Sequence, residues 1–208
     1  MKILFYGDSI TDADRNRSLD FHPSSYGWGF VRDIAGELLS KNPEKYEIIN
    51  RGISGNRIVD LYARVKSDLW NLQPDVISIL IGVNDIWHEI NYQNGVELER
   101  FDKVYRMLIE DTMKVLPNAK IILCEPFVLE GGATQENFEK FLEVKMFAKA
   151  VKQIAEDYDL TFIPLQDTLE DAAKRTAPAY VLWDGVHPSA GGAKLIANEW
   201  LKVFEKEF

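Results

Sequence analysis

Short apolar runs alternate with longer amphipathic segments along the whole chain. The short runs are rich in Ile, Val, Leu and Phe, as buried strands are, and they span residues 2–6, 46–50, 75–81, 120–124 and 161–163. The longer segments repeat apolar residues at helical spacing, over residues 24–42, 57–72, 97–116, 135–158, 166–175 and 189–206. This order predicts an α/β fold in a single domain of residues 1–208, with a five-stranded parallel sheet and helices on both faces.

The loops that leave the predicted strands carry the candidate chemistry. All strands of a parallel sheet end at the same edge, so the polar residues of these loops are expected to converge there. These residues are Asp8 and Ser9 in the first loop, Gly52 to Asn56 in the second, Asn84 and Asp85 in the third, and Asp184 and His187 in the last. The sequence therefore predicts one site built from four distant segments.

Ser9 is the candidate nucleophile of that site. A serine hydroxyl needs a base to take its proton, and a neutral imidazole does this when an acceptor holds its other nitrogen. His187 is the histidine of the last loop, and Asp184 precedes it by three residues, so the pair fits base and acceptor. Alone, this spacing is equally compatible with a helix cap and a surface histidine.

Donors for an oxyanion are expected from the same loops. The backbone N–H groups of Ser9 and Gly55 and the side-chain amide of Asn84 could all face the developing charge. Each residue also has a simpler interpretation, since glycines occupy tight turns and asparagines cap helices. The three histidines lie far apart without ligand spacing, so we expect neither a metal nor another cofactor.

Composition narrows the classes of partner. The formal net charge of −9 disfavours nucleic acid and anionic membranes as partners. Cys124 is the single cysteine, which excludes an internal disulfide, and the N-terminus has no signal-peptide pattern, so we expect a cytoplasmic protein. No run of residues has the length of a transmembrane helix. The five tryptophans are compatible with a homo-oligomeric interface without requiring one.

Four segments resemble the conserved blocks of the SGNH (GDSL) hydrolases, in the order and spacing of that family. The segments are Gly7-Asp8-Ser9, Ile53-Ser54-Gly55-Asn56, Gly82-Val83-Asn84-Asp85 and Asp184-Gly185-Val186-His187-Pro188. The resemblance implies a three-layer, flavodoxin-like fold and ester hydrolysis through Ser9, Gly55, Asn84 and His187, with Asp184 completing a triad. In detail the blocks look most like those of intracellular acetylxylan esterases. Lysophospholipases, thioesterases and platelet-activating-factor acetylhydrolase-like enzymes remain alternatives.

Aromatic side chains near the blocks favour an acetylated sugar as substrate. Trp28, Trp87 and Trp183 are candidate substrate-binding residues, because aromatic faces suit sugar rings, although such residues also pack site rims and subunit contacts. His88 follows the Asn84 block closely and could line the pocket too, or be a solvated loop histidine. The loop after Ser9 is polar, with residues 12 and 14–17 all charged or amide-bearing. This favours a short acyl group over a long chain. The expected partner is a small ester or an acetylated oligosaccharide.

Asp8 and Asp85 admit a second class of function. A receiver domain shares this order of strands and helices and carries acidic residues at strand ends, which Asp8 and Asp85 could provide. Such a domain gives no role to Ser9 or to the spacing of Asp184 and His187, so we consider it the weaker hypothesis. In an esterase, both carboxyls are expected to brace the loops by hydrogen bonds.

Overall fold

Five parallel strands form one sheet in the computed structural model, which describes residues 1–18 and 22–207. The strands are β1 (Lys2–Gly7), β2 (Glu47–Gly52), β3 (Val76–Leu80), β4 (Lys120–Cys124) and β5 (Thr161–Ile163). Their order is β2-β1-β3-β4-β5, and every neighbouring pair is parallel. The predicted sheet is confirmed. Part of the polar loop that follows Ser9, residues 19–21, lies outside the described residues.

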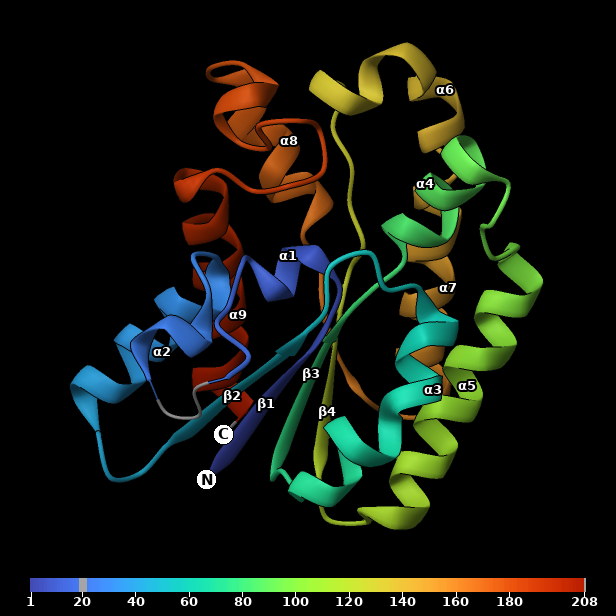
Figure 1. The fold of residues 1–208 in the computed structure, drawn as a ribbon. Coiled ribbons are helices and arrows are strands. Elements are labelled where there is room, and N and C mark those ends of the chain that lie inside the picture. The colour runs from blue at the N-terminus through green and yellow to red at the C-terminus, as the bar shows by residue number, and fades with distance from the viewer. Residues whose placement is uncertain (19–21, 208) are drawn as a thin grey trace.

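Helices cover both faces of the sheet and complete three layers (Figure 1). One face is covered by α2 (Phe30–Lys41) and α9 (Ala190–Glu207), which also contact each other. The other is covered by α3 (Ile58–Asp68), α5 (Leu98–Val115) and α7 (Val144–Asp157). The helix α8 (Gln166–Lys174) follows β5. This is the strand order and layering of the flavodoxin-like fold, as expected.

Burial along the strands follows their place in the sheet. All five residues of the central strand β3 are buried, because helices cover it on both sides. The edge strand β2 alternates between buried and half-buried residues. Trp200 of α9 is fully buried, packs 5.2 Å from the ring of Phe5, and donates its indole N–H to Ser78 Oγ at 3.0 Å. These contacts fix α9, and the loop before it, on the sheet.

The first predicted helix starts later than its pattern indicated. Residues 23–26 form a short 3-10 turn, and α2 begins only at Phe30. Gly27 between them has φ +77°, and a Cβ on it would lie 2.4 Å from the carbonyl oxygen of Asp12. The chain therefore turns at Gly27, where its backbone packs closely against that of Asp12. Trp28 consequently lies before the helix and not on it, and its side chain is 71% exposed.

A helix was missed directly after β3. The segment from Gly82 to Asp85 was expected to be a loop, but α4 (Val83–Tyr92) starts one residue after Gly82, whose φ is +140°. Apolar residues at positions 83, 86 and 90 carry the helical spacing that could have revealed it. Asn84 and Asp85 consequently sit in a rigid first turn.

Two other predicted helices are interrupted. The segment 135–158 consists of a 3-10 turn (Gly132–Asn137), α6 (Phe138–Phe141) and α7. At the junction of α6 and α7 the amides of Glu143, Lys145 and Met146 bond to carbonyls three residues back, as Glu143 does to Lys140 at 3.1 Å, without a Gly or Pro to mark the break. Similarly, α3 ends at Asp68, and residues 70–72 continue as a 3-10 turn.

Candidate active site

Ser9 lies at the carboxyl end of β1, where α1 (Ser9–Asp12) begins (Figure 1). It is the first residue of α1 rather than a loop residue. The preceding Gly7 packs tightly against β3, because a Cβ on it would lie 2.4 Å from the carbonyl oxygen of Leu80. In this strand order β1 and β3 flank the point where the connections change direction, which is where open α/β sheets bind ligands.

Ser9, His187 and Asp184 form a continuous chain of hydrogen bonds. Ser9 Oγ is 2.8 Å from His187 Nε2, and His187 Nδ1 is 2.7 Å from Asp184 Oδ2. The other oxygen of Asp184 accepts the amides of Val186 at 2.9 Å and His187 at 2.7 Å. A turn at Gly185, with φ +95°, brings the two residues of the last loop into this arrangement. The fold thus joins groups 178 positions apart in the chain.

The surroundings of Asp184 and His187 favour an ionised carboxylate beside an imidazole of raised pKa. Burial opposes ionisation of Asp184, but hydrogen bonds from the His187 ring and from the amides of His187 and Val186 outweigh it and lower its pKa. Burial likewise disfavours the imidazolium of His187. The hydrogen bond and charge of Asp184 outweigh that effect, and the charges of Asp8 and Asp14 add to it, so the pKa of His187 is raised.

The expected oxyanion donors lie on three segments that follow the carboxyl ends of β1, β2 and β3. Ser9 is the first residue of a helix, so its amide has no acceptor within that helix. Gly55 has φ +82°, a conformation that suits glycine, and an added Cβ would lie 4.0 Å from the ring of His88. Asn84 Nδ2 donates to the carbonyl of Asn56 at 3.1 Å, which ties α4 to the loop that carries Gly55.

Two buried carboxyls brace these segments, as expected. Asp8 Oδ1 accepts the amide of Ile10 at 2.9 Å and caps α1. Asp85 accepts the amide of Ile58, at 3.1 and 3.3 Å to its two oxygens, and so holds the start of α3. Each carboxyl therefore fixes the backbone next to an expected oxyanion donor.

Asp8 and Asp85 are both difficult to ionise. Burial raises the pKa of Asp8 to about 7, although the Ile10 amide and the His187 charge oppose this. Asp8 Oδ2 has no hydrogen-bond partner within the described part of the chain. Burial also raises the pKa of Asp85, against the Ile58 amide and with the help of the Asp8 charge.

A cavity of about 300 Å³ opens beside Ser9 and His187. It is lined by Ser9, Ile10, Asp12, Ala13, Asp14, Trp28, Gly29, Ser54, Trp183, His187 and Pro188. Of the four aromatic candidates, Trp28 and Trp183 line it and are 71% and 61% exposed. Trp87 and His88 are outside the lining set: the Trp87 ring lies 5.8 Å from that of His187, and His88 lies beside Gly55.

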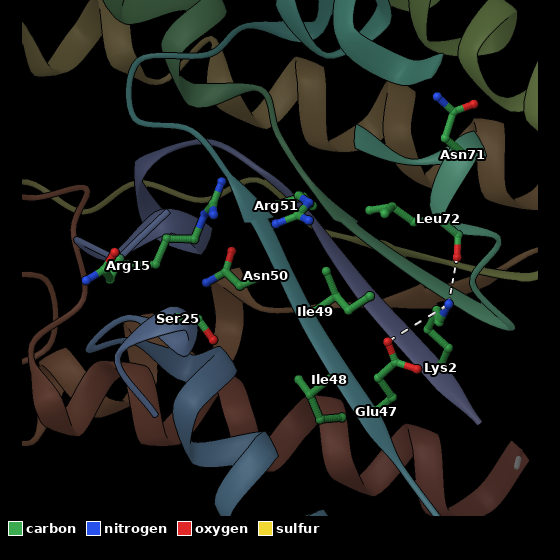
Figure 2. A pocket seen from close by; sticks show the side chains of 11 residues that line it. Lys2, Arg15, Ser25, Glu47, Ile48, Ile49, Asn50, Arg51, Asn71 and Leu72 are labelled. Atoms are coloured by element: carbon green, nitrogen blue, oxygen red, sulfur yellow. Dashed lines mark hydrogen bonds and ion pairs between the residues drawn. The ribbon is translucent and has the colours of Figure 1, made fainter. Parts of the chain in front are cut away.

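The charged side chains of the segment after Ser9 point into two different pockets. Asp12 and Asp14 line the cavity, and Asp12 also accepts the amide of Ser54 at 2.9 Å. Arg15 instead donates to the carbonyl of Gly52 at 2.9 Å and points into a different pocket, against the edge strand β2. Figure 2 shows this second pocket, where Lys2 bonds to Glu47 and to the carbonyl of Leu72. Arg15 therefore does not shape the cavity at Ser9.

The described part of the chain holds neither a metal-binding cluster nor a membrane-spanning helix. No group of three or more His, Cys, Asp or Glu side chains within residues 1–18 and 22–207 is arranged to hold a metal ion. None of the helices in this part of the chain combines the length and apolar character needed to cross a bilayer.

Comparison with known proteins identifies the family. The model of the GDSL-like lipase/acylhydrolase family matches residues 5–195. The chain belongs to this family. A structure from Parabacteroides merdae, classed as a GDSL-like lipase, has a TM-score of 0.93 and 38% identity, covering 98% of this chain and 95% of that one.

An acetylxylan esterase from Geobacillus stearothermophilus is also similar. This GDSL-family chain is 34% identical to it over 207 residues, which is 97% of this chain and 92% of the relative. A structure of that esterase, Axe2, gives a TM-score of 0.88 and covers 100% of this chain and 95% of the other. The protein is therefore an SGNH esterase, a carboxylic ester hydrolase of a family that works through an acyl-serine intermediate.

Proposed function

We propose that this esterase removes short acyl groups, above all acetyl, from carbohydrate esters, with Ser9 as nucleophile, His187 as general base and Asp184 as the acceptor that orients it. The observation that carries this proposal is the unbroken hydrogen-bond chain from Ser9 Oγ through the imidazole to Asp184. A hydroxyl, a base and an oriented acceptor at these distances are the parts that acyl transfer requires.

The reaction proceeds in two steps. Ser9 Oγ attacks the ester carbonyl as its proton passes to His187 Nε2, and the C–O bond to the alcohol then breaks. The alcohol leaves with the proton from His187, and the acyl group stays on Ser9. A water molecule gives its proton to His187, attacks the acyl carbon and releases the carboxylic acid, which restores the Ser9 hydroxyl.

The negative charge on the carbonyl oxygen is stabilised by the amides of Ser9 and Gly55 and by the side-chain amide of Asn84. Donors held in place before the reaction need no reorganisation when the charge develops, and each typically contributes about 3 kcal/mol of transition-state stabilisation. The bracing contacts of Asp8 and Asp85 support this assignment, because they fix the segments that carry the donors.

The cavity supports a short acyl group on a sugar. Its volume of about 300 Å³ is small, and the exposed carboxylate of Asp14 lines it together with the largely exposed side chains of Trp28 and Trp183. Carboxylates accept hydrogen bonds from hydroxyl groups, while indole faces suit the apolar faces of sugar rings. The similarity to an acetylxylan esterase points to acetylated xylo-oligosaccharides.

Labelling with a fluorophosphonate tests the nucleophile. The parent protein is expected to gain one phosphonyl group, located on Ser9 by peptide mass spectrometry, and Ser9→Ala is expected to gain none. Equal labelling of both proteins would overturn the assignment. Phosphorylation of Asp8 or Asp85 by acetyl phosphate would instead favour the receiver hypothesis.

Acyl-chain preference tests the substrate class. We expect kcat/KM for p-nitrophenyl esters to fall from acetate to octanoate, and acetate to be released from acetylated xylo-oligosaccharides. A preference for octanoate, or for a lysophospholipid, would reject the acetyl-sugar proposal in favour of the lipid-esterase alternative. A cytoplasmic location and homo-oligomerisation stay predictions.

A further inference from the structure

Two indole rings lie close to the imidazole of His187. The ring of Trp183 is 5.7 Å from it between centroids, with the two planes only 19° apart, so the rings are stacked. The ring of Trp87 lies 5.8 Å away at 47°. Both distances are within the range of about 6 Å in which an aromatic face attracts a cation. Both rings therefore lie close enough to attract a positive charge on His187 by a cation–π interaction.

The backbone holds Trp183 in this position although most of its side chain is exposed. Its amide donates to the carbonyl of His187 at 2.9 Å, and residues 182 and 188 form an antiparallel bridge on either side. Residues 183 and 187 therefore face each other across a closed turn. Trp87 is anchored from α4, since its ring packs edge-on against Phe141 at 5.7 Å.

We propose that Trp183 is a positioning residue for the general base, which keeps the His187 ring directed at Ser9 and stabilises the imidazolium formed when Ser9 is acylated. This inference rests on the proposed role of His187. In that step the proton moves from Ser9 Oγ to His187 Nε2, and the ring becomes a cation stacked on an electron-rich indole face. Trp87 contributes from a second, tilted ring.

Three carboxyls already act on the same imidazole. Asp184 bonds to it, and the charges of Asp8, the N-cap of α1, and of Asp14, from the segment after α1, also favour its protonated form. The indoles add to these charges without carrying one. Removing the indole of Trp183 should therefore make the imidazole easier to deprotonate while all three carboxyls stay in place.

Trp183 also lines the cavity, so stacking on a sugar is the competing role. The two roles predict different results. A sugar-stacking residue affects substrates that contain a sugar and leaves the resting imidazole unchanged. A residue that stabilises the imidazolium affects every ester, including p-nitrophenyl acetate, and changes the pKa of His187 without any substrate present.

The test compares Trp183→Phe and Trp183→Leu with the parent. The chain has three histidines, so NMR can follow each ring through a pH titration, with His187 assigned by the loss of its signal in His187→Gln. We expect the pKa of His187 to fall by about 0.5 to 1 in the Leu variant and by less in the Phe variant, because a phenyl face attracts a cation more weakly. kcat for p-nitrophenyl acetate should fall about three- to tenfold in the Leu variant, with KM little changed.

Trp28→Leu is the matched control. Trp28 is another exposed indole of the same cavity, and its ring is paired with the guanidinium of Arg32 at 5.2 Å rather than with His187. This variant should leave the pKa of His187 at the parent value. An unchanged pKa in both Trp183 variants, or equal shifts for Phe and Leu, would overturn the inference. Normal turnover by His187→Gln would instead overturn the proposed base, since the resting titration does not depend on catalysis.

Discussion

Two buried carboxyls near His187, Asp184 and Asp8, have opposite charge preferences. Asp184 is 5% exposed and Asp8 is 0% exposed, so both are removed from water. Nevertheless, the pKa of Asp184 is lowered, while burial raises that of Asp8 to about 7. Depth in the protein alone therefore does not decide which carboxyl carries the charge that the imidazole needs.

The difference follows from the hydrogen-bond donors together with the deeper burial of Asp8. Asp184 accepts two amides and the imidazole N–H, all at 2.7 to 2.9 Å. Asp8 accepts one amide through Oδ1. A carboxylate with two or three donors keeps its charge in a buried site, and one with a single donor does not recover the cost of desolvation. The last loop thus supplies the ionised acid, and the end of β1 supplies a structural one.

Asp184→Asn is expected to have the largest effect in this comparison. The variant side chain still accepts the amides of Val186 and His187, so the fold should remain, but its NH₂ group faces His187 Nδ1 and favours the wrong tautomer. We expect kcat to fall by about 10³- to 10⁴-fold, with little change in the thermal unfolding midpoint. Steady-state kinetics with p-nitrophenyl acetate measures this. Near-normal turnover in a folded variant would contradict the role of Asp184.

Local patterns predicted most of the fold. The strands β4 and β5 were predicted to the residue, because short apolar runs between turn residues are strong signals. The start of α2 and the break before α7 were missed. The start of α2 depends on the contact of Gly27 with a segment distant in the sequence, and the break before α7 on a change of hydrogen bonding at Glu143. Neither leaves a local sequence pattern.

The candidate site was predictable in its parts but not in its electrostatics. The expected convergence of the strand-end loops and the family resemblance indicated Ser9, Asp184 and His187 as a unit, and the structure places them within hydrogen-bond distance. The pKa of Asp8 is raised while that of Asp184 is lowered. This difference depends on how many hydrogen-bond donors reach each carboxyl oxygen, and no sequence pattern gives that number. The stacking of Trp183 on His187 was also missed, although a spacing of four residues around a turn could have suggested it.

Asp8→Asn is expected to change how stability depends on pH. A carboxyl whose pKa rises from 3.8 unfolded to about 7 folded contributes stability that is present below pH 4 and lost as the pH rises through 7. Between pH 5 and 8 the parent should therefore lose about 2 to 3 kcal/mol of unfolding free energy relative to Asp8→Asn, which cannot ionise. Urea denaturation at several pH values measures the difference.

Asp184→Asn is the natural control for that experiment. Its lowered pKa predicts the opposite sign, since Asp184 contributes stability above its unfolded pKa and loses it as the pH falls through the folded value. Between pH 5 and 8 Asp184 itself stays ionised, so it affects the pH dependence of stability in this range only through the raised pKa of His187. If the parent and Asp8→Asn instead have parallel stability curves over this range, Asp8 is ionised throughout and the contrast with Asp184 disappears.

The smallest expected effect is on the pH dependence of the rate. Only neutral His187 accepts the Ser9 proton, so kcat/KM should increase with pH and reach a plateau. The pKa of His187 is raised, so the midpoint of this increase should lie above pH 6.5. Asp8 ionises in the same range and favours the imidazolium, so the two titrations are coupled and the parent curve should be broader than a single ionisation. In Asp8→Asn we expect a single ionisation with its midpoint lower by a few tenths.

Asp14→Asn separates charge from burial in that experiment. Asp14 is exposed and also raises the pKa of His187, so its removal should lower the midpoint too. Salt screens a charge in contact with water more than a buried one. The shift caused by Asp14→Asn should therefore shrink in about 1 M NaCl, where the Debye length is about 3 Å, while that of Asp8→Asn persists. If salt reduces both shifts equally, Asp8 acts on His187 through solvent. That result would contradict the distinction between Asp184 as the ionised acid and Asp8 as a buried structural one.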